Sequence, residues 1–450
     1  MTSYQTHLEK FLDMAADLRF EDLSPETVAH TERVIYDTIC AMLSGSLEPE
    51  NRKLAELLPQ GSQKAATAFA APYVTTDCLR AAFFNASEAT FLEMDEHHRP
   101  TGHPGSHVLP SAIAQAEALD SSGKDLITAI VVGYDLAARL ANGCVLRDFM
   151  HCHGHMGAVG AALANAKLRG FNKEQMRETI HIAAGIPLFS AWAPCFEGAT
   201  VRNTYTGMAA LTGILAADLA QSGYTGLSNA LEYTFGELIG SSFDLEALSK
   251  DLAAPFQIDT NLFKFHGCCA MNHPPIEAFL DAVKDHPLDW REIDHMVLRV
   301  TDRCMRLNRL PAPRQLSTKF SIPFAVATTA YHGHSSPEAF RDGPAGNPEI
   351  LELASRIYMV SDPALTARWP QDGGASIDIY LKSGGKLHGH VDNPYGWLTR
   401  PSNDQDLIQK FSRLTREIYS TEQAQKIFAL CDCIADMEHI SGFLRVLKEI

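Results

Sequence analysis

The sequence predicts a mainly α-helical fold, in which a large all-helical domain carries an inserted, smaller α+β domain. Three observations lead to this prediction. Helical periodicity continues through about residue 260 without a sustained strand, alternating β-branched segments lie between about 274 and 397, and helical periodicity then returns. Because a helical tail most simply packs on the first helical domain, we expect helices at 1–265, an α+β domain at 266–398 and returning helices at 399–450.

The helices of the N-terminal part begin and end at recognisable signals. Ser24 is a typical cap, and Pro25 suits the first helical position, where its missing N–H would be unpaired anyway. An apolar face then continues to Ser44 and Gly45, which end the helix. Small residues at 158–168 and 207–220 predict helices that pack closely. The other expected helices are 51–58, 78–92, 111–118 and 125–140.

The α+β domain is predicted from a change of period. Residues 293–301 alternate and are rich in β-branched side chains, which is typical of a strand. Segments 375–381 and 386–391 flank a Ser-Gly-Gly turn and are typical of a hairpin. The expected helices of this domain are 276–283, 322–332 and 348–357, and those of the tail are 403–419 and 422–447.

Composition limits the classes of partner. With 38 basic and 54 acidic side chains the net charge is −16, which argues against nucleic acid or an anionic membrane surface. No apolar run reaches the roughly 18 residues of a membrane span. The N-terminal segment has acids and no apolar core, so we expect no signal peptide. Ten scattered cysteines without zinc-ribbon spacing indicate reduced thiols in a cytoplasmic protein.

The richest candidate site is the segment 91–112, FLEMDEHHRPTGHPGSHVLPSA. Its polar groups could not be buried without partners, so we expect a shaped loop between two helices, the second beginning after Pro110. Loops of titratable groups held between rigid elements commonly carry function. The candidate residues here are Glu93, Asp95, His97, His98, His103 and His107.

Three further stretches are polar where packing does not demand it, and a fourth is weaker. The first precedes one small-residue helix, where a helix N-terminus favours an anion; the second begins the other small-residue helix. Of the three alternating histidines in the first stretch, we expect one to be functional and two to be capping or solvated. The stretches contain His151, His153 and His155; Arg202 and Tyr205; Lys264 and His266; and, in the weaker one, Lys319.

Several chemistries remain in competition. A metal site of His97, His103, His107 and Asp95 is a weaker alternative, because no pair has the HExxH arrangement, and we expect no metal. Cys268 and Ser106 lack the signature of a nucleophile. There is no glycine-rich phosphate loop after a strand, so we expect no nucleotide cofactor. Acid–base chemistry on an anionic substrate remains, because histidine titrates near neutral pH and arginine and lysine bind carboxylates.

The ordered motifs of the chain resemble the MmgE/PrpD family of 2-methylcitrate dehydratases, cis-aconitate decarboxylases and iminodisuccinate epimerases. The resemblance covers nearly the whole chain and rests on HPGSHVLPSAIAQAEAL, GHMGAVGAALANAKLRGF, VRNTYTGMAALTGILAADLAQSGYTG, FKFHGCC and KFSIPFAVATTAYHG. It implies a large helical domain with an inserted α+β lid. It also implies a cofactor-free enzyme that acts on small di- or tricarboxylates, usually as a homodimer.

The resemblance also assigns site residues. His103 and His151 stand at the active-site histidines of the family, and Lys264 stands at its lysine before the lid. Arg202 stands where the decarboxylases have a lysine, while Glu93 and His97 replace an aspartate and a threonine. These departures make decarboxylation to itaconate the least expected of the three activities. Lys319 matches the lysine of the family's KFS segment and is a candidate base for an epimerase-like reaction.

These assignments lead to a working hypothesis for the reaction. We expect a hydro-lyase resembling 2-methylcitrate dehydratase, in which His103 and His151 exchange protons and Asp95 orients a histidine. Arg202 and Lys264 would hold carboxylates of the substrate. An epimerase of an imino- or amino-dicarboxylate and a carboxylate-binding protein without turnover are the alternatives. The other residues expected to contact the substrate are Glu93, His97, His98, His155, Tyr205 and His266.

Overall fold

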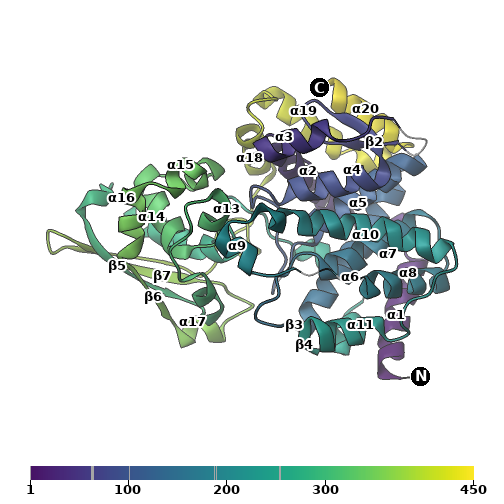
Figure 1. The fold of residues 1–450 in the computed structure, drawn as a ribbon, viewed down its shortest axis with the longest axis horizontal. Coiled ribbons are helices and arrows are strands. Elements are labelled where there is room, and N and C mark those ends of the chain that lie inside the picture. Colours follow the sequence, from purple (N-terminus) through teal and green to yellow (C-terminus); the bar gives the residue numbers. More distant parts are fainter. Residues whose placement is uncertain (1, 62–64, 101, 187, 189, 253–254) are drawn as a thin grey trace.

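The computed structural model describes residues 2–61, 65–100, 102–186, 188, 190–252 and 255–450. Two parts lie side by side in Figure 1, a larger helical part on the right and a smaller part with a sheet on the left. Both marked ends of the chain lie in the helical part. The prediction of a mainly α-helical protein is confirmed.

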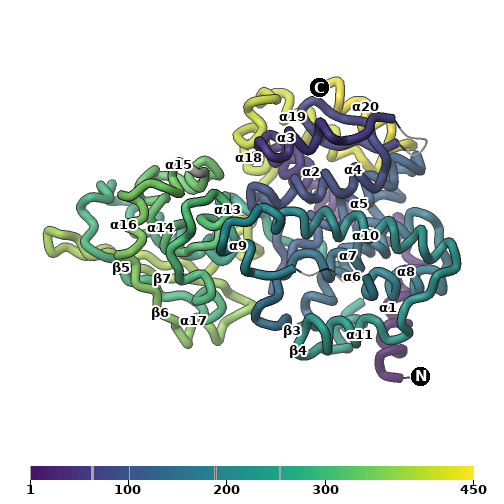
Figure 2. The backbone as a smooth tube through the Cα atoms, viewed as in Figure 1, coloured from purple at the N-terminus to yellow at the C-terminus, as the bar shows by residue number. Residues whose placement is uncertain are grey.

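The helical part combines the first half of the chain with its end. Helices α18 and α19 pack against α2, and Figure 2 shows the yellow C-terminal segment beside α2 and α3. One apolar core accordingly draws residues from Tyr4 to Phe263 and from Leu407 to Leu447. The helices are α1 (Ser3–Asp17), α2 (Pro25–Ser46), α3 (Pro49–Glu56), α4 (Cys78–Ala89), α5 (Pro104–Leu119), α6 (Gly123–Gly143), α7 (His155–Leu168), α8 (Lys173–Gly185), α9 (Ala193–Glu197), α10 (Thr204–Gln221), α11 (Ala230–Tyr233), α18 (Asp404–Leu414), α19 (Thr421–Cys431) and α20 (Ile440–Glu449).

Small residues bring the central helices α6, α7 and α10 into close contact. A Cβ atom added at Gly160 of α7 would lie 2.5 Å from the carbonyl oxygen of Gly133 in α6. One added at Gly213 of α10 would lie 2.6 Å from the Cβ of Ala161. Any larger side chain at these glycines would therefore separate helices whose packing fixes the loops at their ends.

Helix α6 is long and apolar enough to cross a membrane by length and composition, which the sequence analysis did not anticipate. Within its apolar window, however, 94% is buried by the surrounding helices. The apolar side chains of α6 therefore pack in the protein's own core.

The smaller part is built on a four-stranded sheet of order β6-β5-β7-β8, in which β5 and β6 are parallel and the other pairs antiparallel. Helix α12 packs on β7 and β8, and α14 packs against α12 and α16. A second core occupies this part and extends to Trp192 and Cys195. The elements are α12 (His273–Val283), β5 (Ile293–Val300), α13 (Gln315–Thr318), α14 (Ile322–His332), α15 (Asp342–Ala345), α16 (Pro348–Ser355), β6 (Ile357–Ser361), α17 (Pro363–Ala367), β7 (Ala375–Leu381) and β8 (Lys386–Val391).

Four expectations about local structure were wrong. Helix α5 begins at Pro104, which takes the first helical position itself, so Pro110 lies inside the helix. The helical part has two small sheets, whose strands are too short to show a period. The predicted helix 348–357 ends at Ser355 and is followed by β6, and the final predicted helix is divided into α19 and α20. The small sheets pair β1 (Ala65–Ala68) with β2 (Val74–Asp77) and β3 (Cys144–Leu146) with β4 (Gly240–Phe243).

Candidate active site

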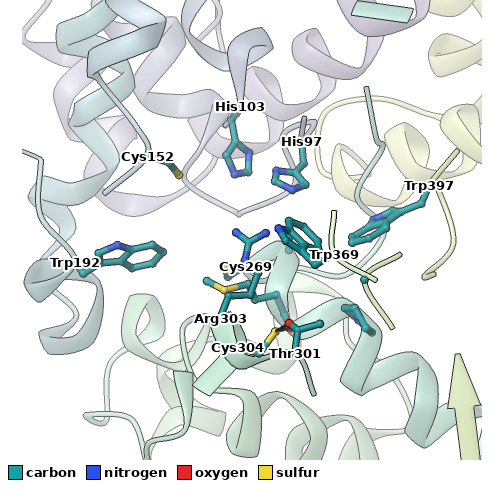
Figure 3. Close-up of a pocket in the computed structure, with 14 residues that line it drawn as sticks. His97, His103, Cys152, Trp192, Cys269, Thr301, Arg303, Cys304, Trp369 and Trp397 are labelled. Carbon is teal, nitrogen blue, oxygen red and sulfur yellow. Dashed lines mark hydrogen bonds between the residues drawn. The ribbon is translucent and has the colours of Figure 1, made fainter. Parts of the chain in front are cut away.

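A pocket lies between the two parts of the molecule. The loop before α5 and the segment around Cys152 form one wall, while residues at the start of α12 and after β5 form the opposite wall (Figure 3). Three tryptophans and several sulfur-containing side chains make much of the lining apolar. The lining residues are His97, His103, Cys152, Trp192, Cys269, Ala270, Met271, Pro274, Thr301, Arg303, Cys304, Trp369, Gly373 and Trp397.

His103 is the residue at which the loop becomes helix α5, and its ring points into the pocket (Figure 3). The ring Nδ1 lies 2.7 Å from the carbonyl oxygen of Glu96 and 2.9 Å from Oδ2 of Asp95. Both partners are acceptors, so Nδ1 carries the hydrogen and donates it. The remaining nitrogen, Nε2, therefore has a lone pair suited to accepting a proton from a bound substrate.

His97 repeats this arrangement beside His103. Its Nδ1 donates to the carbonyl oxygen of Gly102 at 2.9 Å, and the centroids of the two rings lie 5.0 Å apart. Burial, together with the neighbouring His103 and Arg303, holds the pKa of His97 well below its usual value. A pair of imidazoles on one wall thus offers two positions for proton transfer.

Behind these histidines lies a buried network of two carboxylates and two cationic side chains. Glu93 has a φ of 57°, uncommon outside glycine, and its carboxylate bridges Arg202 and Lys264. Lys264 Nζ lies 3.3 Å from Glu93 Oε2 and 3.7 Å from Asp95 Oδ1. None of the four lines the pocket, and each is at most 2% exposed. The two cations are thus balanced by the protein's own carboxylates.

The electrostatics of this network keep its acids ionised. Burial raises the pKa of Asp95, but the contact with His103 and the charges of Lys264 and Arg202 outweigh burial and hold that pKa below its usual value. Burial likewise raises the pKa of Glu93, and Arg202 and Lys264 outweigh it. An ionised Asp95 fixes the tautomer of His103, so the network acts on the pocket through that histidine.

Arg303 is a pocket residue that the sequence analysis missed. It follows β5 and faces His97 and His103 from the opposite wall (Figure 3). Its Nη1 donates to the carbonyl oxygen of Pro100 at 2.8 Å, and its guanidinium stacks on Trp369. No acidic side chain of the described residues forms an ion pair with Arg303, and none lines the pocket. An arginine held in this way is suited to binding the carboxylate of a ligand.

Comparison with known proteins identifies the family of the chain. The MmgE/PrpD N-terminal domain matches residues 9–244, and the MmgE/PrpD C-terminal domain matches residues 266–436. The chain belongs to the MmgE/PrpD family. It is 23% identical to a cis-aconitate decarboxylase of Aspergillus terreus, with 96% of this chain and 94% of that protein covered. It is 25% identical to the cis-aconitate decarboxylases of Mus musculus and Homo sapiens, with 98% of this chain and 93% or 94% of those proteins covered.

The second histidine that MmgE/PrpD resemblance assigns, His151, lies beside the pocket and not in its lining. Its ring packs on Trp192 at 4.5 Å between centroids, and its Nδ1 accepts a hydrogen bond from the backbone N–H of His153. We expected two of the three alternating histidines to be capping or solvated. None of the three is solvated, because all are buried. His155 contacts Ser190 at 2.7 Å.

The remaining candidates from the polar stretches of the sequence have partners away from the pocket. His98 contacts Thr260 at 3.2 Å, His266 contacts Ser335 at 2.5 Å, and the Tyr205 hydroxyl accepts from Ala191. The metal set considered from the sequence is not assembled, because both ring nitrogens of His107 have partners. They contact the carbonyl oxygen of His103 and the backbone N–H of Gly154.

Lys319, the candidate base of an epimerase, lies in a different place. It lines a separate pocket with Phe91 and Arg314, and its Nζ donates to the carbonyl oxygen of Phe91 at 2.8 Å. Burial lowers the pKa of Lys319 to about 8. Its amine thus titrates near neutral pH, but away from the pair of histidines.

Glu96 is a second residue that the sequence analysis did not single out. Its carboxyl group accepts from the backbone N–H of Gly105 and from the hydroxyl of Tyr134, both at 2.6 Å. Burial raises the pKa of Glu96 to about 7, although Tyr134 and His103 oppose this. Glu96 thus supports the loop that carries His103.

The pH dependence of stability tests this state of Glu96. A raised carboxyl pKa contributes stability that is present below its unfolded value and is lost as the pH rises to about 7. Glu96→Gln does not titrate, and its amide can accept from Gly105 through the oxygen and donate to the Tyr134 hydroxyl through the nitrogen. Its free energy of unfolding relative to wild type should therefore increase by up to about 3 kcal/mol between about pH 5 and pH 8 in denaturant titrations. Glu277→Gln is the control, because the pKa of Glu277 is lowered to about 2; an equal change in both variants would contradict the assignment.

Proposed function

We propose that the protein is a cofactor-independent hydro-lyase that removes a proton next to a carboxylate of a small carboxylic acid. The observation that carries this proposal is the pair of imidazoles, His97 and His103, on the wall that faces Arg303. Arg303 binds the carboxylate and stabilises the negative charge that develops on it as the proton leaves. His103 takes that proton at Nε2 and passes it to the lone pair on His97 Nε2, which is left free because Nδ1 donates to Gly102. The protonated His97 then gives the same proton to the hydroxyl group, which leaves as water.

The position of the bases favours elimination over epimerisation. An epimerase with two bases needs a second proton-transfer group on the face opposite the first. The wall opposite the histidines offers Arg303, Thr301 and the thiols of Cys269 and Cys304, and burial raises the pKa of both thiols. Neither thiol is therefore suited to deprotonate a substrate near neutral pH. We keep an epimerase of an imino- or amino-dicarboxylate as the alternative.

Decarboxylation is the second candidate, because all the relatives named above are cis-aconitate decarboxylases. Identity of 23–25% leaves room for a different reaction within one family. We rank decarboxylation below the hydro-lyase reaction because Glu93 and His97 replace an aspartate and a threonine that the resemblance assigns to the decarboxylase site.

Proton NMR in D2O separates the candidates. The purified protein is incubated with hydroxy-, amino- and unsaturated di- and tricarboxylates. Loss of a C–H signal with a new olefinic signal and no loss of carbon supports the hydro-lyase. Release of CO2 supports a decarboxylase, and exchange with changing optical rotation but no olefin supports an epimerase. Absence of turnover and exchange across the panel, together with saturable ligand binding, would support the binding-only alternative.

Replacing Arg303 tests the proposed carboxylate contact. Arg303→Met removes a charged hydrogen bond worth about 1.5–3 kcal/mol, so we expect KM to rise by roughly ten- to a hundredfold. Arg306→Met is a matched control on the same short helix (Asp302–Leu307), because Arg306 does not line the pocket. A normal KM in the Arg303 variant, measured with the substrate found by NMR, would contradict the contact.

The assembly and location of the protein are also proposals. We propose a cytoplasmic homodimer, in which the α+β part acts as a lid that brings Arg303 to the histidines. Light scattering of the purified chain tests the dimer, and a mass of one chain at micromolar concentration would exclude it.

A further inference from the structure

Behind the pair of pocket histidines lies an imidazole that the proposed reaction does not use. His153 is fully buried, and among the described residues neither of its ring nitrogens has a hydrogen-bond partner. A buried polar group without a partner costs about 1–3 kcal/mol, so such groups commonly mark a bound ion or water. The ring of His153 lies 4.6 Å from that of His103, between centroids. The unpartnered ring of His153 is thus next to the proposed base, His103.

We propose that His103, Cys152 and His153 form a binding site for a divalent, thiophilic cation of the zinc type. One ligand atom from each of the three side chains lies within 4.8 Å of the other two. Two imidazole nitrogens and a thiolate are ligands that zinc prefers, at about 2.0–2.3 Å. Tetrahedral coordination at those lengths requires ligand atoms roughly 3.3–3.6 Å apart. Side-chain movements that shift the ligand atoms by about 1 Å would therefore complete the site.

The groups around His103 match the surroundings of a metal ligand. A histidine that binds metal through one ring nitrogen usually donates its other N–H to a carboxylate or a backbone carbonyl. His103 Nδ1 donates to the carbonyl oxygen of Glu96 and lies 2.9 Å from Oδ2 of Asp95. His103 and Cys152 line the pocket, so the fourth coordination position faces it.

Occupancy of this site would switch off the proposed reaction, and this consequence depends on the proposed function. With Nδ1 donating to the carbonyl oxygen of Glu96 and Nε2 bound to the cation, His103 has no nitrogen left to accept a proton. Coordination also requires the Cys152 thiol to release its proton to solvent. The affinity for the cation should therefore increase with pH.

Cobalt(II) is the probe for the site, because its spectrum reports the ligands without any need for activity. Chelator-treated full-length protein is titrated with Co²⁺ alone. We expect saturable binding of one ion with tetrahedral visible bands and a near-ultraviolet thiolate charge-transfer band, tighter at about pH 8 than at about pH 6. Cys152→Ser should lose the charge-transfer band. Cys269→Ser should keep it, because Cys269 lines the same pocket outside the proposed ligand set.

Two further variants and an activity assay complete the test. His153→Asn should weaken Co²⁺ binding by more than tenfold, and Asp95→Asn, which acts through His103, by about 10–100-fold. Absence of the band in wild type, or its persistence in Cys152→Ser, would overturn the site. Zn²⁺ should inhibit wild type far more than Cys152→Ser, and a chelator should reverse this. Co²⁺ binding without any inhibition of turnover by Zn²⁺ would overturn only the claim that the occupied site blocks the reaction. Absence of turnover in every sample would contradict the proposed function and leave the cation site to be judged from the Co²⁺ spectra.

Discussion

His103→Ala is expected to lower kcat by about 10²–10⁴-fold, the usual contribution of a positioned acid or base. The reason is geometric, because Nδ1 is held by Asp95 and by the carbonyl oxygen of Glu96 while Nε2 remains for the substrate. Steady-state kinetics with the substrate identified by NMR measures the effect. KM should change less than kcat, since carboxylate binding is assigned to Arg303.

A control separates this role from general damage to the loop. His98→Asn changes a buried histidine of the same loop whose ring contacts Thr260, outside the pocket. We expect it to retain most of the wild-type kcat and circular dichroism spectrum. Equal losses of kcat in the two variants would show that the loop's structure, and not the His103 nitrogen, is responsible.

Glu93→Gln is expected to destabilise the fold by about 3–5 kcal/mol, the usual result of removing one partner from a buried ion pair. Its carboxylate is the shared partner of Arg202 and Lys264, both excluded from solvent. Losing it leaves two buried cations with Asp95 alone. Equilibrium unfolding in denaturant measures this loss as a lower transition midpoint.

The matched control for Glu93 is an exposed ion pair. Glu422 pairs with Lys426 one helical turn away in α19, and Glu422→Gln should leave the unfolding curve unchanged. If Glu93→Gln unfolded like wild type but raised KM, the network would be a substrate-binding element. Arg202 and Lys264 would then regain the role of carboxylate ligands that the sequence suggested.

The helical organisation of the protein could be predicted because it depends on period. The apolar face of α2 and the small residues of α7 and α10 are repeated over several turns, and these helices are present. Strand β6 was missed because it has only five residues and follows a helix directly, so its alternation of buried and exposed side chains is too short to recognise. Pro110 was misread as a helix start because an equally suitable proline, Pro104, stands six residues earlier.

The candidate site was predictable only in part, for a similar reason. The concentration of histidine and acid in one segment pointed to His97 and His103, and these two line the pocket. Nothing local distinguishes Arg303 from other arginines, since its importance comes from the wall it faces. The partners of Arg202 and Lys264 were equally hidden, because a positive φ at Glu93 directs its carboxylate to residues far along the chain.

The division of labour between the two histidines is the central claim, and His97→Gln in D2O tests it most directly. If His103 removes the proton and His97 serves the leaving group, the variant should stop forming olefin yet still incorporate deuterium into the recovered substrate. His103→Ala should lose both processes. Loss of exchange in His97→Gln, or unchanged olefin formation, would contradict the account.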